Sequence, residues 1–546
     1  MNQSRDIPDF VIVGSGAAGG VMAKELAEAG FRVVVLEQGP YLHEKDFQHD
    51  ELKVNFQSAI VNDQKLQPNT FRKNEWEKAE RRTAIEYCRM VGGGSVHFTA
   101  NYWRFHESDF RERTQWGDVP GANLADWPIT YDELEPYYTK AEYELGISGL
   151  AGANPFESRR SKPYPLPPLP VKSSGVLFER AARKLGLHPY PAPMAILSRN
   201  YRGRSSCQHC GFCMAFGCEY GAKSSTLASV IPMAEMTGRC EIRSGCYVRK
   251  VETDAAGRAA GVIYFNSARK EVLQRARAVI LCANGAETPR LLLMSRSNRF
   301  PQGLANSNGL VGRNLMVDLG CVSFGLFEHP LNEFKSVQVT RVVHDYYASD
   351  PKRGFYGGGG IDARFGAYPV AFALGGLPPG APRWGKEYKQ MLAHYYTRTM
   401  MLLAHTSCLA QEKNSISLDP ELKDAWGLPA IRMTYDFHPD DLKTLQFCQD
   451  RELEILEAAG ARRIWEFPLD SDIFPTRHLM GTCRIGTDPK TSVINTDHRA
   501  HDIPNLFVCD GSSLVTCGRQ QPTATIQALA YRAAERIAGL AKRGEV

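Results

Sequence analysis

Apolar runs and a glycine-rich turn alternate over the first 36 residues and predict a strand, a helix and a second strand. Residues 9–13 form a short run that is wholly apolar after Asp9, which is typical of a strand in a sheet that is covered on both faces. Residues 14–19 are GSGAAG, and apolar side chains then recur at helical spacing until Gly30. Residues 31–36 are apolar again. The pattern therefore predicts a complete βαβ unit with parallel strands.

Farther along the chain the pattern is of two kinds. Residues 277–281 and 505–508 are strand-like runs similar to the first, and residues 523–540 predict a long amphipathic helix. Between residues 320 and 470, short strand-like runs alternate with glycine-rich turns, which indicates an antiparallel sheet. Residues 161–200 are rich in proline and predict an extended connector. We therefore expect an α/β protein with a parallel sheet and a second, antiparallel region.

Composition narrows the class of protein. Of the 546 residues, 43% are hydrophobic and 23% are charged, as in ordinary soluble globular proteins. The net charge of +5 is small for this length, so we expect no nucleic-acid partner. No apolar run approaches the roughly 18 residues of a membrane helix. The run at residues 10–23 contains glycines and is followed by Lys24 and Glu25, so we expect neither a direct membrane span nor a signal peptide.

The turn at residues 14–19 has the context of a dinucleotide site. Gly14 permits a tight turn, Gly16 lets the backbone approach a pyrophosphate, and Gly19 allows the helix to pack closely on the strand. The phosphates then lie at the positive end of the helix. Glu37 ends the next strand, where a carboxylate can bind a ribose diol. The motif does not distinguish FAD from NAD, and the alternative is a turn that binds no ligand.

Other motifs follow in order: GGGS at 92–95, ANGAETP at 283–289, GRNL at 312–315, HLMGTCRIG at 478–486 and DGS at 510–512. Together with GSGAAG and Glu37 they resemble the glucose–methanol–choline (GMC) oxidoreductases over the whole chain. Within that family the resemblance is closest to the gluconate 2-dehydrogenase flavoprotein subunits and the glucoside 3-dehydrogenases. The resemblance implies FAD rather than NAD as the cofactor.

The resemblance also implies how the chain is divided. A Rossmann-like FAD-binding domain is assembled from discontinuous segments, and a substrate domain is built on an antiparallel sheet with helices. The expected segments are 1–160 (FAD-binding, first part), 161–200 (connector), 201–319 (cysteine cluster and FAD-binding, second part), 320–476 (substrate domain) and 477–546 (FAD-binding, with the catalytic residues).

Two residues are expected to act on the substrate. His478 occupies the position of the family's catalytic histidine and would accept the hydroxyl proton while a hydride passes to flavin N5; the alternative is a structural histidine. The second member of the pair is His or Asn in the family, but here the residue before Pro-Thr is Gln521. Glutamine keeps an amide donor and acceptor, but its extra methylene moves them. Gln520 is the alternative.

His97 follows the GGGS turn, at the place where some family members bond the flavin covalently to a histidine. The alternative is a histidine that packs beside a non-covalent flavin. The other FAD contacts implied by the resemblance are Gly93, Ser95, Val248, Asp510, Gly511, Pro522 and Thr523.

Four cysteines fall within twelve residues, with the spacing C-x2-C-x2-C-x4-C: Cys207, Cys210, Cys213 and Cys218. Closely spaced thiolates suit an iron–sulfur cluster, although the last gap is longer than in ferredoxins. Structural zinc and no metal at all are the alternatives. A cluster near the flavin would carry electrons singly, which favours a dehydrogenase over an oxidase that uses oxygen.

The expected function is an FAD-dependent dehydrogenase that oxidises a secondary hydroxyl of a sugar or glycoside, with carbon 3 as the first candidate, to a ketone. The alternatives are an alcohol or sugar oxidase that uses oxygen and a flavin-carrying electron-transfer subunit without substrate chemistry. The resemblance implies a small subunit exported by the twin-arginine route and a cytochrome c acceptor. It therefore implies a periplasmic location by co-export, with a cytoplasmic enzyme as the alternative.

Overall fold

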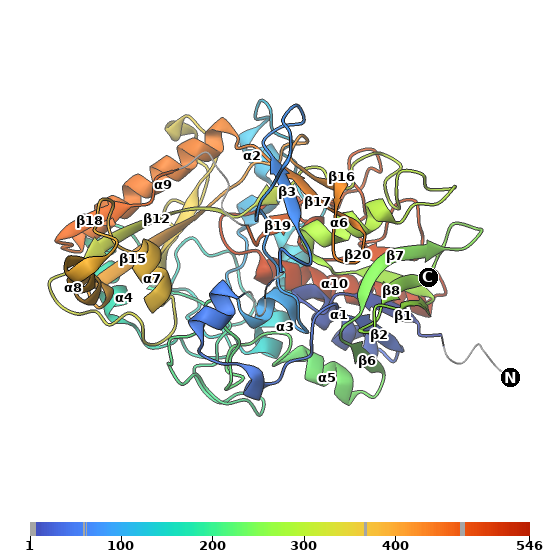
Figure 1. Ribbon diagram of the computed structural model, residues 1–546, viewed down its shortest axis with the longest axis horizontal. Coiled ribbons are helices and arrows are strands. Elements are labelled where there is room, and N and C mark those ends of the chain that lie inside the picture. Colours follow the sequence, from blue (N-terminus) through green and yellow to red (C-terminus); the bar gives the residue numbers. More distant parts are fainter. Residues whose placement is uncertain (1–6, 58–60, 62, 365–367, 470–475) are drawn as a thin grey trace.

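The computed structural model describes residues 7–57, 61, 63–364, 368–469 and 476–546. Two regions lie side by side in Figure 1, one around a parallel sheet and the other around an antiparallel sheet. Both termini lie on the side of the parallel sheet.

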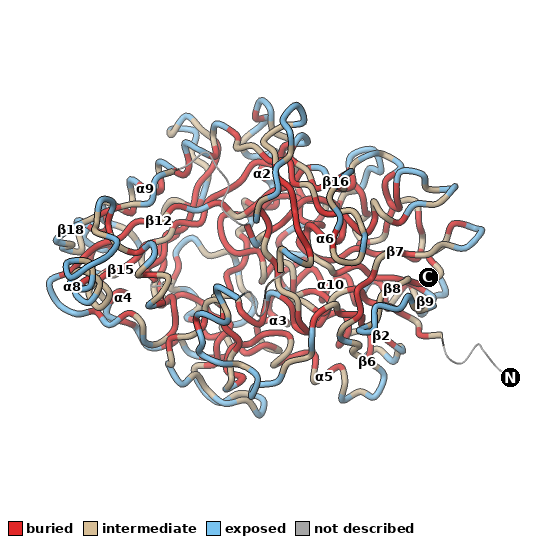
Figure 2. Tube along the Cα trace, viewed as in Figure 1, coloured by how far each residue is buried: buried red, intermediate tan, exposed pale blue. Residues whose placement is uncertain are grey.

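The parallel sheet is the core of the first region. Its strands lie in the order β20 (Leu506–Val508), β10 (Ala278–Leu281), β1 (Phe10–Val13), β2 (Val33–Leu36) and β6 (Cys240–Arg243), and every pair is parallel. β1, β2, β10 and β20 are wholly buried (Figure 2), as their apolar sequences predict. Because the strands come from residues 10 to 508, the sheet is assembled from discontinuous segments.

Helices cover this sheet. The predicted βαβ unit is confirmed: α1 (Ala17–Glu28) starts directly after the glycine turn and ends before Gly30, whose φ is +98°. It packs against α10 (Thr523–Lys542), the predicted C-terminal helix, and against α5 (Val230–Met236). α3 (Tyr131–Leu145) packs on α10 and begins with a capping box of Thr130 and Glu133.

The second region is built on a six-stranded sheet whose strands pair antiparallel. Its order is β18 (Arg463–Glu466), β12 (Leu319–Leu326), β15 (Thr399–Thr406), β14 (Gly359–Arg364), β13 (Arg341–Val343) and β5 (Tyr190–Pro191). α9 (Pro439–Ala458) packs across β12 and β15, and α4 (Ser173–Lys184) packs on β13 and β14. The antiparallel sheet predicted for residues 320–470 is therefore confirmed, with helices on it.

The prediction of an extended connector at residues 161–200 is wrong. Ser173–Lys184 forms α4, and Tyr190–Pro191 adds an edge strand to the antiparallel sheet. The prolines lie before and after the helix and none lies within it, and apolar positions such as Phe178 and Ala181 are buried against the sheet. The stretch without proline thus forms a helix that packs on the sheet.

Two small pairings join distant parts of the chain. β11 (Met316–Val317) and β19 (Leu479–Met480) form an antiparallel ladder, and β3 (Asn69–Arg72) pairs with β17 (Pro429–Thr434). The remaining elements are β4 (Glu80–Arg81), β7 (Tyr247–Thr253), β8 (Ala259–Phe265), β9 (Glu271–Arg275), β16 (Ser415–Lys423), α2 (Glu112–Trp116), α6 (Asn284–Met294), α7 (Pro369–Gly375) and α8 (Gly385–Tyr396). Within the described residues, no helix is both long and apolar enough to cross a bilayer.

Candidate active site

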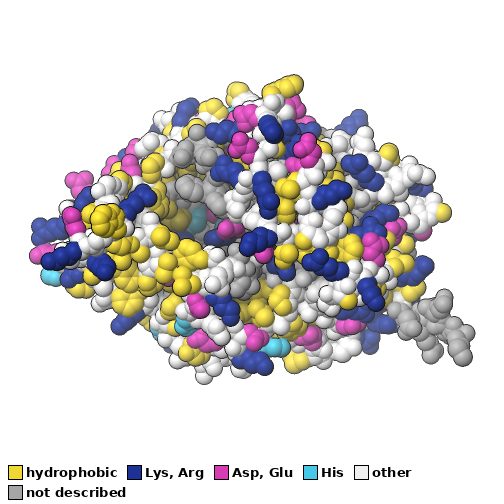
Figure 3. All heavy atoms as spheres, in the orientation of Figure 1, with side chains coloured by type: hydrophobic (Ala, Val, Ile, Leu, Met, Phe, Trp, Pro, Cys, Tyr) yellow, Lys and Arg dark blue, Asp and Glu magenta, His cyan; other side chains and the backbone are white. Residues whose placement is uncertain are grey.

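A cavity of about 990 Å³ has its walls in both regions. One end is formed by the turn after β1 and by Glu37, and the other end by His478, Gln521 and strands of the antiparallel sheet. Figure 3 shows a hollow on the face between the two regions. The cavity therefore connects the predicted dinucleotide motif with the predicted catalytic residues.

The glycines of the turn have distinct environments. A Cβ at Gly14, where φ is +91°, would lie 2.5 Å from the Cys282 carbonyl oxygen, and one at Gly19 would lie 2.0 Å from the Gly14 carbonyl oxygen. Gly19 therefore packs the helix against the turn and does not line the cavity. A Cβ at Gly16 would meet nothing closer than Gly93 Cα, 3.9 Å away, so Gly16 leaves open space in the cavity wall.

Glu37 is buried and closes the turn. Its Oε2 accepts hydrogen bonds from the Ser15 backbone N–H and hydroxyl, at 3.1 Å and 2.8 Å, and its Oε1 accepts from Gly39 N at 3.0 Å. Burial raises the pKa of this carboxyl, and the hydrogen bonds from Gly39 and Ser15 partly oppose the rise. Because Oε2 already accepts two hydrogen bonds, Oε1 is the oxygen suited to accept from a ligand hydroxyl.

The other predicted cofactor residues also line this cavity: Gly93, Ser95, His97, Val248, Asp510, Gly511, Pro522 and Thr523. Asn101, which the sequence analysis missed, lines it too and is buried. Its amide nitrogen and oxygen have no hydrogen-bond partner among the described residues. A glycine-lined end, a buried carboxylate and an unpaired amide fit the polar groups of a flavin dinucleotide.

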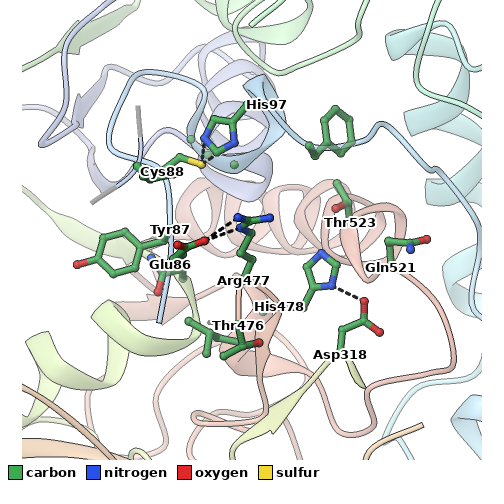
Figure 4. Close-up of a pocket in the computed structure, with 18 of the residues that line it drawn as sticks. Glu86, Tyr87, Cys88, His97, Asp318, Thr476, Arg477, His478, Gln521 and Thr523 are labelled. Atoms are coloured by element: carbon green, nitrogen blue, oxygen red, sulfur yellow. Dashed lines mark hydrogen bonds and ion pairs between the residues drawn. The ribbon is translucent and has the colours of Figure 1, made fainter. Parts of the chain in front are cut away.

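The two-stranded ladder of β11 and β19 positions the first catalytic candidate. Val317 lies opposite Leu479, so the next residues, Asp318 and His478, face each other where the ladder ends. His478 Nδ1 lies 2.6 Å from Asp318 Oδ2 (Figure 4). The Asp318 side chain is 11% exposed and that of His478 31%, so the imidazole keeps access to the cavity. Asp318 was not predicted, although it lies three residues after the GRNL motif.

A second histidine shares the same carboxylate. His405 of β15 places its Nδ1 3.2 Å from Asp318 Oδ2, and its Nε2 contacts the side-chain nitrogen of Gln521. Arg364 Nη2 lies 2.9 Å from the same Nε2. Nothing local in the sequence pointed to His405, because it stands in an apolar strand far from every motif. Gln520 instead donates to the Arg104 carbonyl and does not line the cavity.

Asp318 is held as an anion by these two rings. Burial by itself would raise the pKa of this carboxyl, but His405 and His478 outweigh burial, and the pKa lies well below its usual range. A carboxylate that stays ionised accepts hydrogen bonds and does not donate them. Each imidazole must therefore present an N–H to Asp318.

His97 is also buried in the cavity wall. Its Nε2 contacts the thiol of Cys88, and burial together with the positive charges of Lys223 and Arg477 lowers the pKa of His97 to about 3. A neutral imidazole has a lone pair on one nitrogen, as nucleophilic attachment to a flavin ring requires. The attachment itself stays a prediction.

The four clustered cysteines do not line the main cavity. Cys207, Cys210, Cys213 and Cys218 surround a separate small cavity beside Lys223. Ligation needs sulfurs that converge on one point, which is stricter than closeness. Among the described residues, no three His, Cys, Asp or Glu side chains are placed to hold a metal ion. The arrangement therefore does not support the predicted iron–sulfur cluster.

The segment that carries these cysteines supports the main cavity. Lys223 Nζ donates to the carbonyls of Cys213 and Phe216, at 2.6 Å each, and to that of Phe98 at 3.1 Å. Ala215 N donates to the His97 carbonyl at 2.8 Å. The cysteine segment thus holds the backbone on which His97 stands.

Comparisons with known proteins cover nearly the whole chain. The chain is 34% identical to the 2-methyl-1,2-propanediol dehydrogenase of Mycolicibacterium austroafricanum, over 98% of this chain and 96% of the relative. It is 30% identical to the gluconate 2-dehydrogenase flavoprotein of Pantoea cypripedii, over 97% and 93% of the two chains. It is also 30% identical to the fructose dehydrogenase large subunit of Gluconobacter japonicus, over 98% of both.

A solved structure shares the fold. Pyridoxine 4-oxidase has a TM-score of 0.65 at 17% identity, over 97% of this chain and 98% of that one. The two parts of the GMC oxidoreductase family match residues 8–319 and residues 410–530. The protein therefore belongs to the GMC oxidoreductase family and is an FAD-dependent oxidoreductase that acts on CH–OH groups.

Proposed function

We propose that the protein is a dehydrogenase that oxidises a hydroxyl group of a sugar, a glycoside or a related polyol, with His478 as the base. One observation carries the proposal: in a cavity that starts at a dinucleotide turn, His478 faces the open space and is oriented by a buried carboxylate 2.6 Å away. A histidine held in this way is suited to accept a proton from an alcohol.

The residues that would hold FAD are the turn glycines, Glu37 and the remaining lining residues described above. The backbone at Gly16 would approach the pyrophosphate at the start of α1, and Glu37 would accept from a ribose hydroxyl. Asn101 would pair with the polar edge of the flavin ring. When bound, the flavin would supply the two-electron oxidation of the carbinol carbon.

The protein's own contribution is to place the proton acceptor. Asp318 can only accept, so His478 must carry its proton on Nδ1 and leave Nε2 with a lone pair. That lone pair is the acceptor for the substrate's hydroxyl proton. The Asp318 carboxylate stabilises the imidazolium that forms when His478 gains this proton, as in other His–Asp arrangements.

The names of the three relatives narrow the substrate class. A 1,2-propanediol, gluconate and fructose all carry hydroxyl groups on adjacent carbons. We therefore infer that the substrate has a vicinal diol and is oxidised at one of its two carbinol carbons. For a pyranoside, a secondary hydroxyl is the proposed target, and carbon 3 is the position to test first.

We also propose a partner that receives the electrons. One relative is named a large subunit, which supports assembly with at least one other chain. A small subunit exported by the twin-arginine route and a cytochrome c acceptor would place the complex in the periplasm. Co-expression with a neighbouring small subunit, followed by cell fractionation, tests this part. Activity that stays in the cytosol with and without that subunit would refute it.

The iron–sulfur cluster is not part of this proposal, because the described cysteines are not arranged as its ligands. Measuring iron and acid-labile sulfide in the purified holoprotein tests whether a cluster is present, and stoichiometric amounts of both would show that it is.

We also propose that FAD is bound covalently through His97 in the same holoprotein. Acid-precipitated protein should then keep its yellow colour. Flavin found wholly in the supernatant would show that His97 packs beside a non-covalent flavin.

The activity test uses His478→Ala with a matched control. The variant should bind FAD but reduce it with substrate about 10²-fold more slowly or worse, the usual contribution of a general base. His188 is the control, because it forms a similar pair with Asp345 at 2.7 Å but is exposed and lies outside the cavity. His188→Ala should change nothing.

Dye reduction across a panel of sugars and diols, with and without oxygen, then identifies the acceptor class. Faster turnover with dye than with oxygen supports a dehydrogenase, whereas efficient peroxide formation indicates an oxidase. Flavin that no member of the panel reduces would indicate an electron-transfer subunit and refute the proposal.

A further inference from the structure

The side-chain amide of Gln521 has a hydrogen-bond partner for its nitrogen but not for its oxygen. Its nitrogen contacts His405 Nε2, while its Oε1 has no hydrogen-bond partner among the described residues. The side chain lines the cavity and the residue is only 7% exposed. A buried carbonyl oxygen without a partner is unfavourable, so this oxygen is suited to a donor that arrives with the ligand.

Which end of the amide faces the cavity depends on its neighbours, because the nitrogen and oxygen of a carboxamide exchange places by a half-turn. Arg364 decides the question. Its guanidinium can only donate, and its Nη2 lies 2.9 Å from His405 Nε2. His405 Nε2 must therefore be the acceptor. The Gln521 NH2 group can share its lone pair with Arg364, whereas the Gln521 oxygen would face that lone pair with its own.

The sheet gives the His405 ring room and a fixed plane. His405 pairs with Gly320 on β12 and with Gly360 on β14, so neither flanking position has a side chain. The Trp103 ring packs edge-on at 6.0 Å from the imidazole. His405 Nδ1 then donates to Asp318, which also accepts from His478.

Resting on the proposed function, we propose that His405 is a positioning residue that holds the amide of Gln521 so that Oε1 faces the substrate. Oε1 then accepts a hydrogen bond from the hydroxyl next to the one being oxidised. Gln521 would thus select vicinal diols, and its extra methylene relative to asparagine would let it reach that second hydroxyl. His405 does not touch the substrate in this arrangement.

The arrangement depends on the charge of His405. Burial lowers the pKa of His405, but Asp318 and Asp362 outweigh burial and leave it raised. Protonated Nε2 would donate, with Asp362 Oδ2 3.5 Å away, and its N–H would repel the Gln521 NH2 group, so the amide would reverse and turn its NH2 group to the cavity. The charged or titratable groups that face His405 are Asp318, Asp362, Arg364, His344 and His478.

The test compares trans-1,2-cyclohexanediol with cyclohexanol, which differ only in the second hydroxyl. At alkaline pH the wild-type enzyme should favour the diol in kcat/KM by about tenfold or more, the worth of one hydrogen bond to a buried unpaired group. The preference should fall as the pH is lowered and His405 gains a proton. Because His478 serves both substrates, its own titration cancels in the ratio.

Two variants separate positioning from general damage. Gln521→Leu should reduce the preference to within about twofold of unity at every pH. His405→Leu should do the same although it leaves Gln521 in place, and the double variant should lose nothing more. Should His405→Leu fail to fold, His405→Ala takes its place, and added imidazole should restore the preference.

A binding measurement separates this inference from the proposed function. In holoprotein carrying His478→Ala, the flavin absorbance change on titration should show the diol binding about tenfold more tightly than cyclohexanol. Adding Gln521→Leu should abolish that difference. Equal affinity for the two ligands, or equal loss of both rates in the His405 variants, would overturn the inference even where His478 proves to be the base.

Discussion

The two ends of the cavity are built in different ways. The nucleotide end uses Gly14, Gly16, Gly19 and Glu37, which lie within one βαβ unit and act through backbone geometry and close packing. The end that we propose to be catalytic uses side chains from four separate parts of the chain, at positions 318, 405, 478 and 521. The first therefore has no room for an added atom at Gly14 or Gly19, whereas we expect the second to tolerate changes of shape better than changes of hydrogen-bonding pattern.

Asp318 lies where the two regions of the protein meet. It lies between β11, which pairs with β19 beside the FAD-side residues, and β12, which belongs to the antiparallel sheet. One carboxylate thus receives a histidine from each region. The catalytic geometry depends on how the two regions meet, and the nucleotide geometry does not.

Gly19→Ala tests the close packing at the nucleotide end and should have the largest effect on FAD content and stability. Its Cβ would lie 2.0 Å from the Gly14 carbonyl oxygen, so the helix or the turn has to move. Overpacking of this kind destabilises a protein by about 1–3 kcal/mol or more, and the phosphate cradle moves with it. We expect little FAD in the purified variant and a lower melting temperature, measured by flavin absorbance and calorimetry.

Gly16→Ala is its matched control, because a Cβ there has 3.9 Å of room within the protein. The variant should keep the melting temperature of the ligand-free protein and weaken FAD binding, since the methyl group occupies cavity space. Equal thermal destabilisation by the two substitutions would show that both glycines serve folding alone.

The same contrast explains what could be predicted from sequence. The strand, turn and helix at residues 9–36 carry their signal in adjacent positions, so the element boundaries and the cavity wall agree with prediction. His478 and Gln521 were predicted as catalytic candidates from family motifs, and both line the cavity. Neither periodicity nor motif singles out His405, because a polar residue within an apolar strand has no local meaning until β15 and the β11–β12 corner are brought together.

The helix α4 was missed for a related reason. Prolines before residue 173 indicate extended chain, whereas the packing of α4 on β13, β14 and α9 is not visible in the local sequence. Asn101 was missed because an amide beside a glycine-rich motif is ordinary in sequence. Its significance lies in being buried without a partner.

Asp318→Asn tests the hydrogen-bonding pattern at the other end of the cavity and should have the next largest effect, on the rate of flavin reduction. The carboxamide keeps the shape but can turn a donor toward His478 Nδ1, which would then accept there and lose the Nε2 lone pair. We expect kcat for flavin reduction to fall about 10²-fold or more, with FAD content unchanged.

Asp419→Asn is a suitable control, because Asp419 is a buried carboxylate paired with Arg432 at 3.0 Å, away from the cavity. It should leave kcat within about twofold. Comparable losses of kcat in both variants would place the effect of Asp318 in the fold rather than in the orientation of His478.

The pH dependence of stability tests whether Asp318 joins the two regions. Its folded pKa is depressed despite burial, because of His405 and His478, so its stabilisation exists above about pH 4 and is lost as the pH falls. The pKa of His405 is raised, so its stabilisation is complete below about pH 6.5 and is lost as the pH rises through the folded pKa. The melting-temperature difference between wild type and Asp318→Asn should therefore be largest between about pH 4 and 6.5.

A difference of a few degrees, declining on both sides of that window, is the expected result. Calorimetry of the FAD-loaded proteins across this pH range measures it. A difference that stays constant with pH would mean that Asp318 is not paired with titrating groups.

The smallest expected effect lies at the cavity wall, beside His478. Arg477 pairs with Glu86 at 2.6 Å, and both side chains line the cavity, but Arg477 is 58% exposed (Figure 4). Exposed ion pairs contribute about 0–1 kcal/mol, so Glu86→Gln should move the melting temperature by about 1 °C or less and leave kcat within about twofold. The freed guanidinium should lower KM for an anionic substrate such as gluconate about two- to threefold relative to a neutral sugar, and added salt should remove the difference.

Glu328→Gln, which breaks the exposed pair with Arg462 outside the cavity, should leave that ratio unchanged. A tenfold loss of kcat in Glu86→Gln would instead show that this wall, like Asp318, orients His478, and the catalytic end would then extend to the surface of the cavity.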